Sequence, residues 1–146
     1  MIALAQRVAH AAVRVDGRSV GAIGRGLLVF VCAEPADDET LADRLVERLL
    51  KLRVFADAAG KMNRSVVDVG GALLVVSQFT LAADLSGGRR PSFSGAAPAA
   101  QGRALYERVL ATARSRHPLV EAGEFGAHME VELVNDGPVT IPITLR

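Results

Sequence analysis

The chain has 146 residues, half of them hydrophobic, and a formal net charge of +1. This length suits one domain over residues 1–146 that buries about two-thirds of its unfolded surface. The small net charge argues against a broad basic field, so we expect any contact with nucleic acid to be local. No apolar run approaches membrane-spanning length and the N-terminus lacks the layout of a signal peptide, which predicts a cytoplasmic protein without membrane contact.

The sequence argues against a metal site and against a reactive thiol. Cys32 is the only cysteine, which excludes an intramolecular disulfide and a zinc site built on cysteines. It lies in an apolar run, where we expect a small buried side chain rather than a reactive thiol. His10, His117 and His128 are dispersed without metal-ligand spacing, so we predict no metal site.

The first part of the chain is predicted to form three strands. Ile2, Leu4 and Val8 alternate with small or polar residues, which is the period of a half-buried strand. Asp16-Gly17 is a hairpin signal that leads into a second strand. The continuous apolar run 27–32 predicts a central strand buried on both faces.

Two helices and several short strands follow. Leucines at helical spacing place the first helix over residues 38–51, with Asp37 or Asp38 as its N-cap. The second helix starts near Pro98 and ends before His117-Pro118. Further extended segments are predicted at 53–55, 61–66, 72–76, 129–133 and 139–143. The expected fold class is α/β, a single domain of layered mixed β-sheets with helices packed on one side.

Polar residues follow the apolar strand at 72–76. Ser77, Gln78 and Thr80 can be turn formers that satisfy nearby backbone groups. They can also present hydroxyl, amide and backbone N–H groups to a pocket that holds a carbonyl substrate or its oxyanion. The residues by themselves leave both interpretations open.

Two more segments carry a similar ambiguity. Gly137-Pro138 is expected to be a turn between two alternating strands, and the sequence does not decide whether its peptide bond is cis or trans. Arg89 and Arg90 lie in a long glycine-rich loop over residues 84–95, which is either a solvated basic loop or a phosphate-binding one.

Six segments, in order along the chain, closely resemble the signature segments of D-aminoacyl-tRNA deacylases. They are Gln6-Arg7-Val8, Gly26-Leu27-Leu28-Val29, Gly60-Lys61-Met62-Asn63, Ser77-Gln78-Phe79-Thr80-Leu81, Arg90-Pro91-Ser92-Phe93-Ser94 and Asn135-Asp136-Gly137-Pro138-Val139-Thr140. Each is short, but the ordered set is highly specific. The resemblance implies a layered α/β fold and a cofactor-free enzyme that hydrolyses the ester between a D-amino acid and the terminal adenosine of tRNA. It also implies removal of glycine mischarged on tRNA.

The resemblance further implies a homodimer with its active sites at the subunit interface. Ser77, Gln78, Phe79 and Thr80 line the pocket of one subunit, and Gly137-Pro138 reaches in from the other subunit with a cis peptide bond. Two backbone carbonyls then lie against the substrate α-carbon and reject an L side chain, while a D side chain or a hydrogen fits. Arg7 resembles a family arginine that braces this segment. Arg89 and Arg90 are expected to contact tRNA weakly.

Two mechanisms and two rival functions stay open. Either Thr80 is a nucleophile, or water attacks while backbone N–H groups around Phe79 and Thr80 bind the oxyanion and the tRNA 2′-hydroxyl assists. We prefer water attack because no base is evident near Thr80. One rival is a related enzyme that edits L-alanine mischarged on tRNA, against which Arg7 and the Asn-x-Gly-Pro-x-Thr pattern argue. The other is a nucleic-acid-binding module without catalysis, for which a basic extension would be expected.

Overall fold

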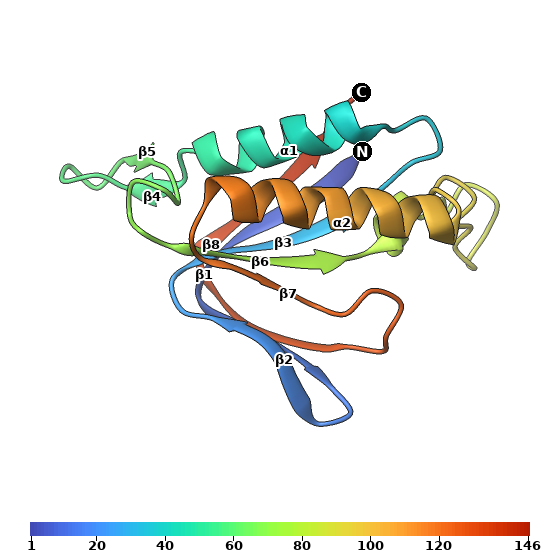
Figure 1. The fold of residues 1–146 in the computed structure, drawn as a ribbon, viewed down its shortest axis with the longest axis horizontal. Helices are drawn as coiled ribbons and strands as arrows, with labels where there is room; N and C mark the ends of the chain where they lie inside the picture. Colours follow the sequence, from blue (N-terminus) through green and yellow to red (C-terminus); the bar gives the residue numbers. More distant parts are fainter.

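A six-stranded mixed sheet organises the protein, and two helices cover one of its faces (Figure 1). The computed structural model describes residues 1–146. The elements in chain order are β1 (Ile2–Val15), β2 (Arg18–Ile23), β3 (Gly26–Cys32), α1 (Glu39–Lys51), β4 (Phe55–Ala56), β5 (Met62–Arg64), β6 (Ala72–Ser77), the 3-10 turn η1 (Phe79–Ala82), α2 (Ala99–Arg116), β7 (Val120–Ala122) and β8 (Glu130–Thr144). The expected α/β class with helices on one side of the sheet is confirmed.

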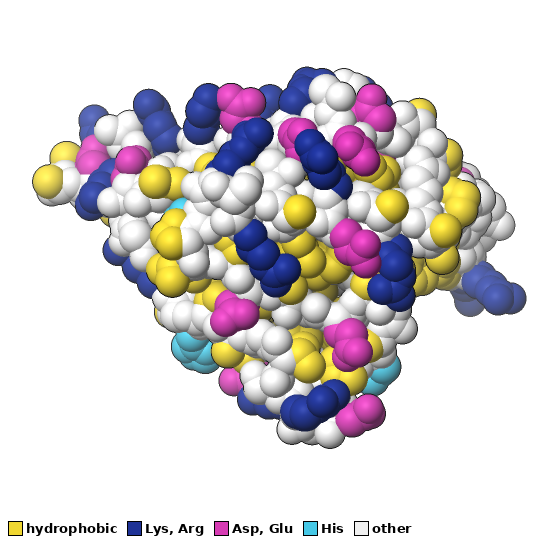
Figure 2. All heavy atoms as spheres, in the orientation of Figure 1, with side chains coloured by type: hydrophobic (Ala, Val, Ile, Leu, Met, Phe, Trp, Pro, Cys, Tyr) yellow, Lys and Arg dark blue, Asp and Glu magenta, His cyan; other side chains and the backbone are white.

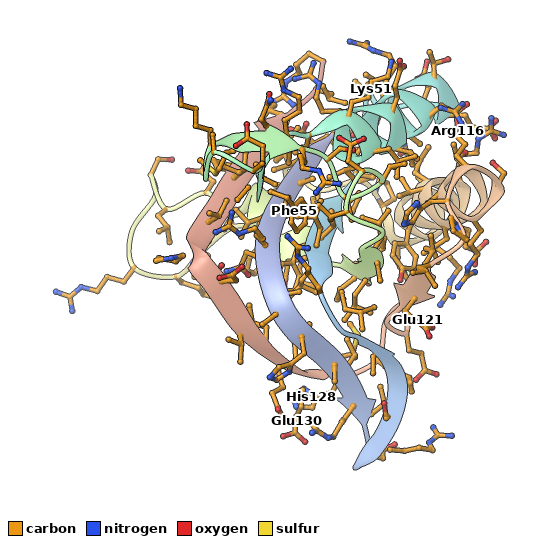
Figure 3. The ribbon with its side chains drawn as sticks, turned by 90° about the vertical axis from the view of Figure 1, so that its left-hand side faces the viewer. Lys51, Phe55, Arg116, Glu121, His128 and Glu130 are labelled. Carbon is orange, nitrogen blue, oxygen red and sulfur yellow. The ribbon has the colours of Figure 1, made fainter.

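The long strand β1 joins the two halves of the sheet. One edge of β1 pairs antiparallel with β3 in its first half and with β2 in its second half. The other edge pairs antiparallel with β8 from end to end, and the two bent strands run side by side in Figure 3. Strands β3 and β6 pair in parallel, as do β6 and β7. Parallel neighbours need a crossover connection, which α1 supplies for the first pair and α2 for the second.

The core lies on both faces of β3 and β6. Leu27 and Leu73 belong to the cluster under the helices, whereas Leu28 and Leu74 belong to a second cluster with β1 and β2. All four side chains are at most 1% exposed. The prediction of a strand buried on both faces is therefore confirmed for residues 27–32.

The start of β1 alternates as expected, but a different set of side chains is buried. Ala3 and Ala5 are each 1% exposed and lie in the core under the helices, whereas Ile2 and Leu4 are only half-buried. The two alanines share this core cluster with Leu45 and Leu49 of α1. The side of β1 that packs under the helices, and not the larger side chain of each neighbouring pair, therefore decides which of these residues are buried.

The two candidate N-caps of α1 have different roles. Asp38 is the N-cap, and its side chain accepts a hydrogen bond from Leu41 N at 2.9 Å. Asp37 is buried and accepts one from the α-ammonium group of Met1 at 2.8 Å. Neither α1 nor α2 combines the length and the apolarity needed to cross a lipid bilayer.

The short strand and the histidines have the following places in the structure. The short strand expected at 53–55 is β4, displaced to Phe55–Ala56 and paired with β5. His128 is exposed just before the start of β8, near Glu130 in Figure 3, whereas His117 is buried with its Nε2 2.7 Å from Gly71 O. No three His, Cys, Asp or Glu side chains are grouped as a metal site would need.

Asp43 of α1 joins the two helices. Its carboxylate accepts hydrogen bonds from Arg108 Nε at 2.8 Å, from Arg108 Nη2 at 2.6 Å and from Thr112 Oγ1 at 2.6 Å, all on α2. The bonds from Arg108 and then Thr112 hold the pKa of Asp43 well below its usual range. A lowered pKa in the folded state contributes stability above the unfolded pKa, and this contribution is lost as the pH falls toward the folded value.

We expect Asp43→Asn to lower the free energy of unfolding at pH 7 by about 1 kcal/mol, since charge-assisted bonds are lost at a partly exposed site. The difference from the wild type should shrink below about pH 4, where the unfolded aspartate becomes protonated. Urea unfolding followed by circular dichroism between pH 7 and pH 3 measures both effects. Glu47→Gln, which removes the exposed pair with Lys51, is the matched control and should change little. A loss of the same size at every pH would contradict the ionic role of Asp43.

Candidate functional site

A cavity of about 430 Å³ lies at the carboxyl ends of β3 and β6, beside the start of α2. In open α/β sheets this edge is the usual position of a ligand. The cavity is lined by the strand ends, by η1 and the loop after it, by α2 and by the loop that follows β7. These residues are Met1, Val31, Cys32, Ala33, Ser77, Gln78, Phe79, Phe93, Ala96, Ala97, Ala99, Gly102, Tyr106, Phe125 and Gly126.

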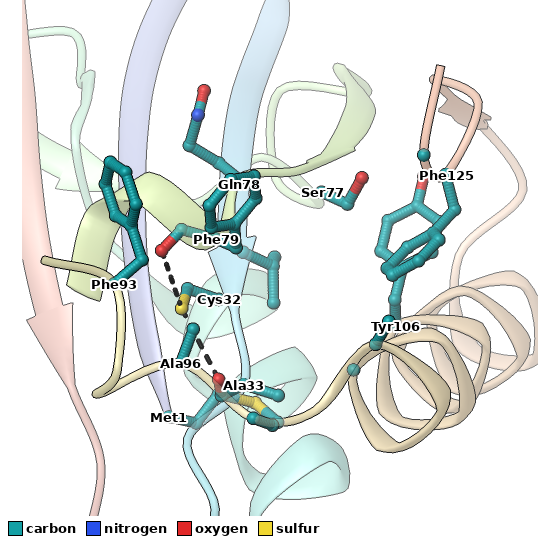
Figure 4. Close-up of a pocket in the computed structure, with 15 residues that line it drawn as sticks. Met1, Cys32, Ala33, Ser77, Gln78, Phe79, Phe93, Ala96, Tyr106 and Phe125 are labelled. Atoms are coloured by element: carbon teal, nitrogen blue, oxygen red, sulfur yellow. Dashed lines mark hydrogen bonds between the residues drawn. The ribbon is translucent and has the colours of Figure 1, made fainter. Parts of the chain in front are cut away.

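Aromatic rings form two facing walls of the cavity (Figure 4). Phe79 and Phe93 meet edge to face with ring centres 5.1 Å apart, and across the cavity Tyr106 and Phe125 lie 5.8 Å apart. Tyr106 Oη donates to Val75 O at 2.9 Å, and burial raises the pKa of Tyr106 to about 12, so the phenol stays neutral. None of the lining side chains is charged. The cavity therefore suits a flat or apolar part of a ligand.

The polar segment after β6 forms one wall of this cavity. Gln78 N donates to Val31 O at 2.8 Å, which ties the end of β6 to the end of β3. Ser77, Gln78 and Phe79 line the cavity, and Phe79 is 58% exposed. Thr80 lies outside the lining, exposed on η1, and its Oγ1 accepts a hydrogen bond from Gln78 Nε2.

Cys32 lies at the base of the cavity and is 2% exposed (Figure 4). Its thiol contacts Phe79 O at 3.5 Å and Ala33 O at 3.4 Å, which links the end of β3 to η1. Burial, and to a smaller extent the charge of Glu34, raises the pKa of the thiol. A raised pKa disfavours the reactive thiolate, and the expected burial of Cys32 is confirmed.

Gly137-Pro138 is not a turn between two strands, and that expectation was wrong. Both flanks of the pair belong to β8, which continues in one direction along β1. Thr140 pairs with Gln6 and Asn135 pairs with Val8, so residues 136–139 of β8 face only Arg7. These surplus residues form a bulge with a cis Gly137–Pro138 peptide bond. Turn-forming residues predicted a change of direction, but both flanks find their hydrogen-bond partners on the same strand.

Side chains on both strands brace the bulge. Arg7 Nε donates to Asp136 O at 3.0 Å. Across the base of the bulge, Asn135 Nδ2 donates to Thr140 Oγ1 at 2.9 Å. Gln6 Nε2 also reaches Thr140 Oγ1, at 3.3 Å. Side-chain hydrogen bonds therefore hold the bulge at both of its ends.

The tip of the bulge lies apart from the cavity of its own chain. Gly137 and Pro138 are exposed, and neither lines the cavity. Arg7 is anchored behind them, because its Nη1 donates to Val54 O at 2.6 Å. Within one chain the structure thus brings Ser77, Gln78 and Phe79 together but leaves the Gly–Pro pair elsewhere.

Arg89 and Arg90 are exposed in the loop between η1 and α2. This loop is closed by a bridge between Asp84 and Ser92 and reaches the cavity with Phe93. The two arginines thus lie close in sequence to the cavity wall without lining it. Figure 2 shows basic and acidic side chains interspersed over the helix-covered face, which agrees with the absence of a broad basic field there.

Sequence patterns did not single out Tyr106 and Phe125 as site residues. Tyr106 has the spacing of a core position on α2, and Phe125 lies in a loop without a motif. The one signal in the sequence was the scarcity of aromatic residues. The chain has five phenylalanines, one tyrosine and no tryptophan, and four of these six rings line the cavity. Asn135 and Thr140 both belong to a motif seen in the sequence, but the hydrogen bond between them could be recognised as a brace only once the pairing of β8 with β1 was known.

Comparison with known proteins identifies the family. The chain matches the family described as D-Tyr-tRNA(Tyr) deacylase over residues 4–144. A D-aminoacyl-tRNA deacylase of Methylibium petroleiphilum is 75% identical over 145 residues, which is 99% of this chain and 95% of that protein. A protein of the same name from Aromatoleum aromaticum is 65% identical over 99% of this chain and 95% of its own length.

Two solved structures resemble this one over nearly the whole chain. A c-Myc DNA unwinding element binding protein has a TM-score of 0.94 at 40% identity and covers 100% of this chain and 99% of its own. A probable eukaryotic D-amino acid tRNA deacylase has a TM-score of 0.85 at 18% identity over 97% of both chains, a likeness of fold alone.

The chain therefore belongs to the D-Tyr-tRNA(Tyr) deacylase family, as its ordered segments implied. This membership supports the predicted activity, hydrolysis of the ester bond of a D-aminoacyl-tRNA.

Proposed function

We propose that the protein removes D-amino acids and mischarged glycine from tRNA as a homodimer whose active sites lie at the subunit interface. In each site, the segment from Ser77 to Thr80 of one subunit faces Gly137 and Pro138 of the partner subunit. The bulge of β8 carries this proposal, because it is exposed, braced by Arg7 and separate from the cavity of its own chain. A braced, protruding segment suits insertion into a second copy of the chain.

The free edge of β8 supports a dimer. Only β1 pairs with β8, so the other edge of this strand of 15 residues has unpaired backbone groups. Proteins usually cover or blunt such edges, because they attract other strands. Val134 on β8 is 47% exposed and Phe79 at the cavity is 58% exposed, which are high values for large apolar side chains. A second copy of the chain would cover both.

Chirality is selected by exclusion in this proposal. Backbone groups of the partner's Gly137 and Pro138 lie against the substrate α-carbon, on the side that an L side chain would occupy. A D side chain points away, and glycine has none, so both substrates are accepted. Glycine is required at position 137, because a Cβ there would lie 2.8 Å from Val139 Cγ2 and 2.9 Å from Val139 N.

Water is the proposed nucleophile. Thr80 Oγ1 has the amide of Gln78 as its hydrogen-bond partner, and a neutral amide is not a base that could take the proton of an attacking hydroxyl. The N–H groups of Phe79 and Thr80 open η1, where the first donors of a helical turn lack partners within it, and they bind the oxyanion. The 2′-hydroxyl of the terminal ribose assists the proton transfer.

The 3′ end of tRNA supplies the rest of the ligand. Its terminal adenosine occupies the aromatic cavity, where the rings suit contact with a base. Arg89 and Arg90 contact backbone phosphates near the cavity mouth, and no acidic oxygen pairs with either of them within the chain.

A deacylation assay with D-Tyr-tRNA, L-Tyr-tRNA and Gly-tRNA tests the proposed activity. We expect hydrolysis of the D-tyrosyl and glycyl esters, while the L-tyrosyl ester decays only at its spontaneous rate, because the L side chain is excluded. Equal rates for the D and L esters would refute the exclusion mechanism. Hydrolysis of L-Ala-tRNA alone would favour the rival editing enzyme, and DNA binding without any hydrolysis would favour the binding module.

Mixed dimers test the shared site. Gln78→Ala damages one half of the site and Gly137→Val the other, so dimers of either variant alone should be impaired. A heterodimer of the two regains one undamaged site if the halves come from different subunits. We expect refolded mixtures to recover D-Tyr-tRNA hydrolysis that neither variant shows by itself. Mixtures that form heterodimers without any recovery would show that each site lies within one chain.

We expect Thr80→Ala to keep hydrolysis of D-Tyr-tRNA within about tenfold of the wild type, since the variant retains the backbone donors; loss of a true nucleophile costs several orders of magnitude. Steady-state kinetics measure the effect. Thr80→Ser is the matched control, because it retains a hydroxyl. A folded Thr80→Ala without activity, beside an active Thr80→Ser, would assign the nucleophile to Thr80.

A further inference from the structure

Arg103 borders the mouth of the cavity. Its guanidinium lies over the ring of Phe125, a lining residue, with Cζ 4.6 Å from the ring centre. A Cβ on Gly126, the next lining residue, would lie 3.9 Å from Arg103 Nη2. Arg103 is not itself among the lining residues, so its charge sits at the rim and not inside.

The hydrogen-bond donors of Arg103 are free to bind a ligand. Stacking on a ring uses the flat face of a guanidinium and leaves the N–H groups on its edge available. The one acidic oxygen within 4.0 Å is Glu107 Oε1, 3.9 Å from Arg103 Nη1, which is too far for a hydrogen bond. The side chain of Arg103 is 54% exposed, so a ligand at the cavity mouth can reach it.

The cavity offers no unpaired counter-charge to an anionic ligand, because the α-ammonium group of the lining residue Met1 is already bound to the carboxylates of Glu34 and Asp37. Its lining side chains are uncharged, and Tyr106 keeps its proton. A nucleotide whose base and ribose enter the cavity must leave its phosphate at the rim, where a cation is needed. An arginine already held by stacking loses less freedom on binding than a mobile one and can form two parallel bonds to phosphate.

We propose that Arg103 binds the phosphate on the 5′ side of the terminal adenosine of tRNA. This inference rests on the proposed function, which places that adenosine in the cavity. Phe125 then has two roles. Its ring forms part of the cavity wall that meets the ligand, and the same ring positions the guanidinium of Arg103 for the phosphate. Arg103 acts in substrate binding and not in the cleavage of the ester.

Two small esters isolate the contribution of the phosphate. One is 3′-O-D-tyrosyl-adenosine, and the other is the same ester of adenosine 5′-monophosphate. We expect the wild type to show a KM about tenfold lower for the phosphorylated ester, as for one exposed charge-assisted contact. Arg103→Ala should erase this difference by raising the KM of the phosphorylated ester, and Arg103→Lys should restore part of it.

Arg25→Ala is the matched control. Arg25 lies over the ring of Phe55 at 5.3 Å, the other arginine–ring pair of the chain, and precedes β3, whose far end borders the cavity. This variant should keep the wild-type preference for the phosphorylated ester.

Two outcomes would overturn the proposal. An equal rise in KM for both esters in Arg103→Ala would mean that Arg103 only holds Phe125, and an unchanged KM for both would mean that Arg103 does not bind the phosphate. If the wild type cleaves neither ester nor D-Tyr-tRNA, the proposed function itself fails.

Discussion

The pairing of β1 is the constraint on which both parts of the proposed site, the cavity and the bulge of β8, depend. One edge of β1 holds β3, whose end borders the cavity, and the other edge holds β8 with its bulge. A shift of one residue in a strand register turns every side chain to the opposite face. The register of β1 therefore sets at once which residues enter the core and where Arg7 meets the bulge.

The chemistry that we propose for the site depends on backbone groups and aromatic rings. Burial raises the pKa of Tyr106 and of Cys32, and the side chains that line the cavity are uncharged. A search of the sequence for catalytic triads or metal ligands cannot find a site of this kind. The selection by shape that we propose needs rigid parts, and the brace around Gly137 and the strand end at Ser77 are of this kind.

Much of the fold followed from local patterns. The leucine spacing and acidic start predicted α1 within one residue of its observed start, and the apolar run at 27–32 predicted a strand buried on both faces. The patterns failed where packing between distant segments decides. Ala3 and Ala5 are buried in place of larger neighbours because their side of β1 belongs to the core cluster under the helices. Which side of a strand packs against a helix depends on both elements, so the sequence pattern of the strand alone does not reveal it.

The sequence by itself determined the types of the elements, the family and the motif segments, because periodicity and motif are properties of neighbouring residues. Only the tertiary structure decided that Gly137 and Pro138 form a bulge inside one strand and that four rings gather at one cavity. The physical reason is separation along the chain. Arg7 and Asp136 are 129 residues apart, and their hydrogen bond exists only because β1 and β8 pair.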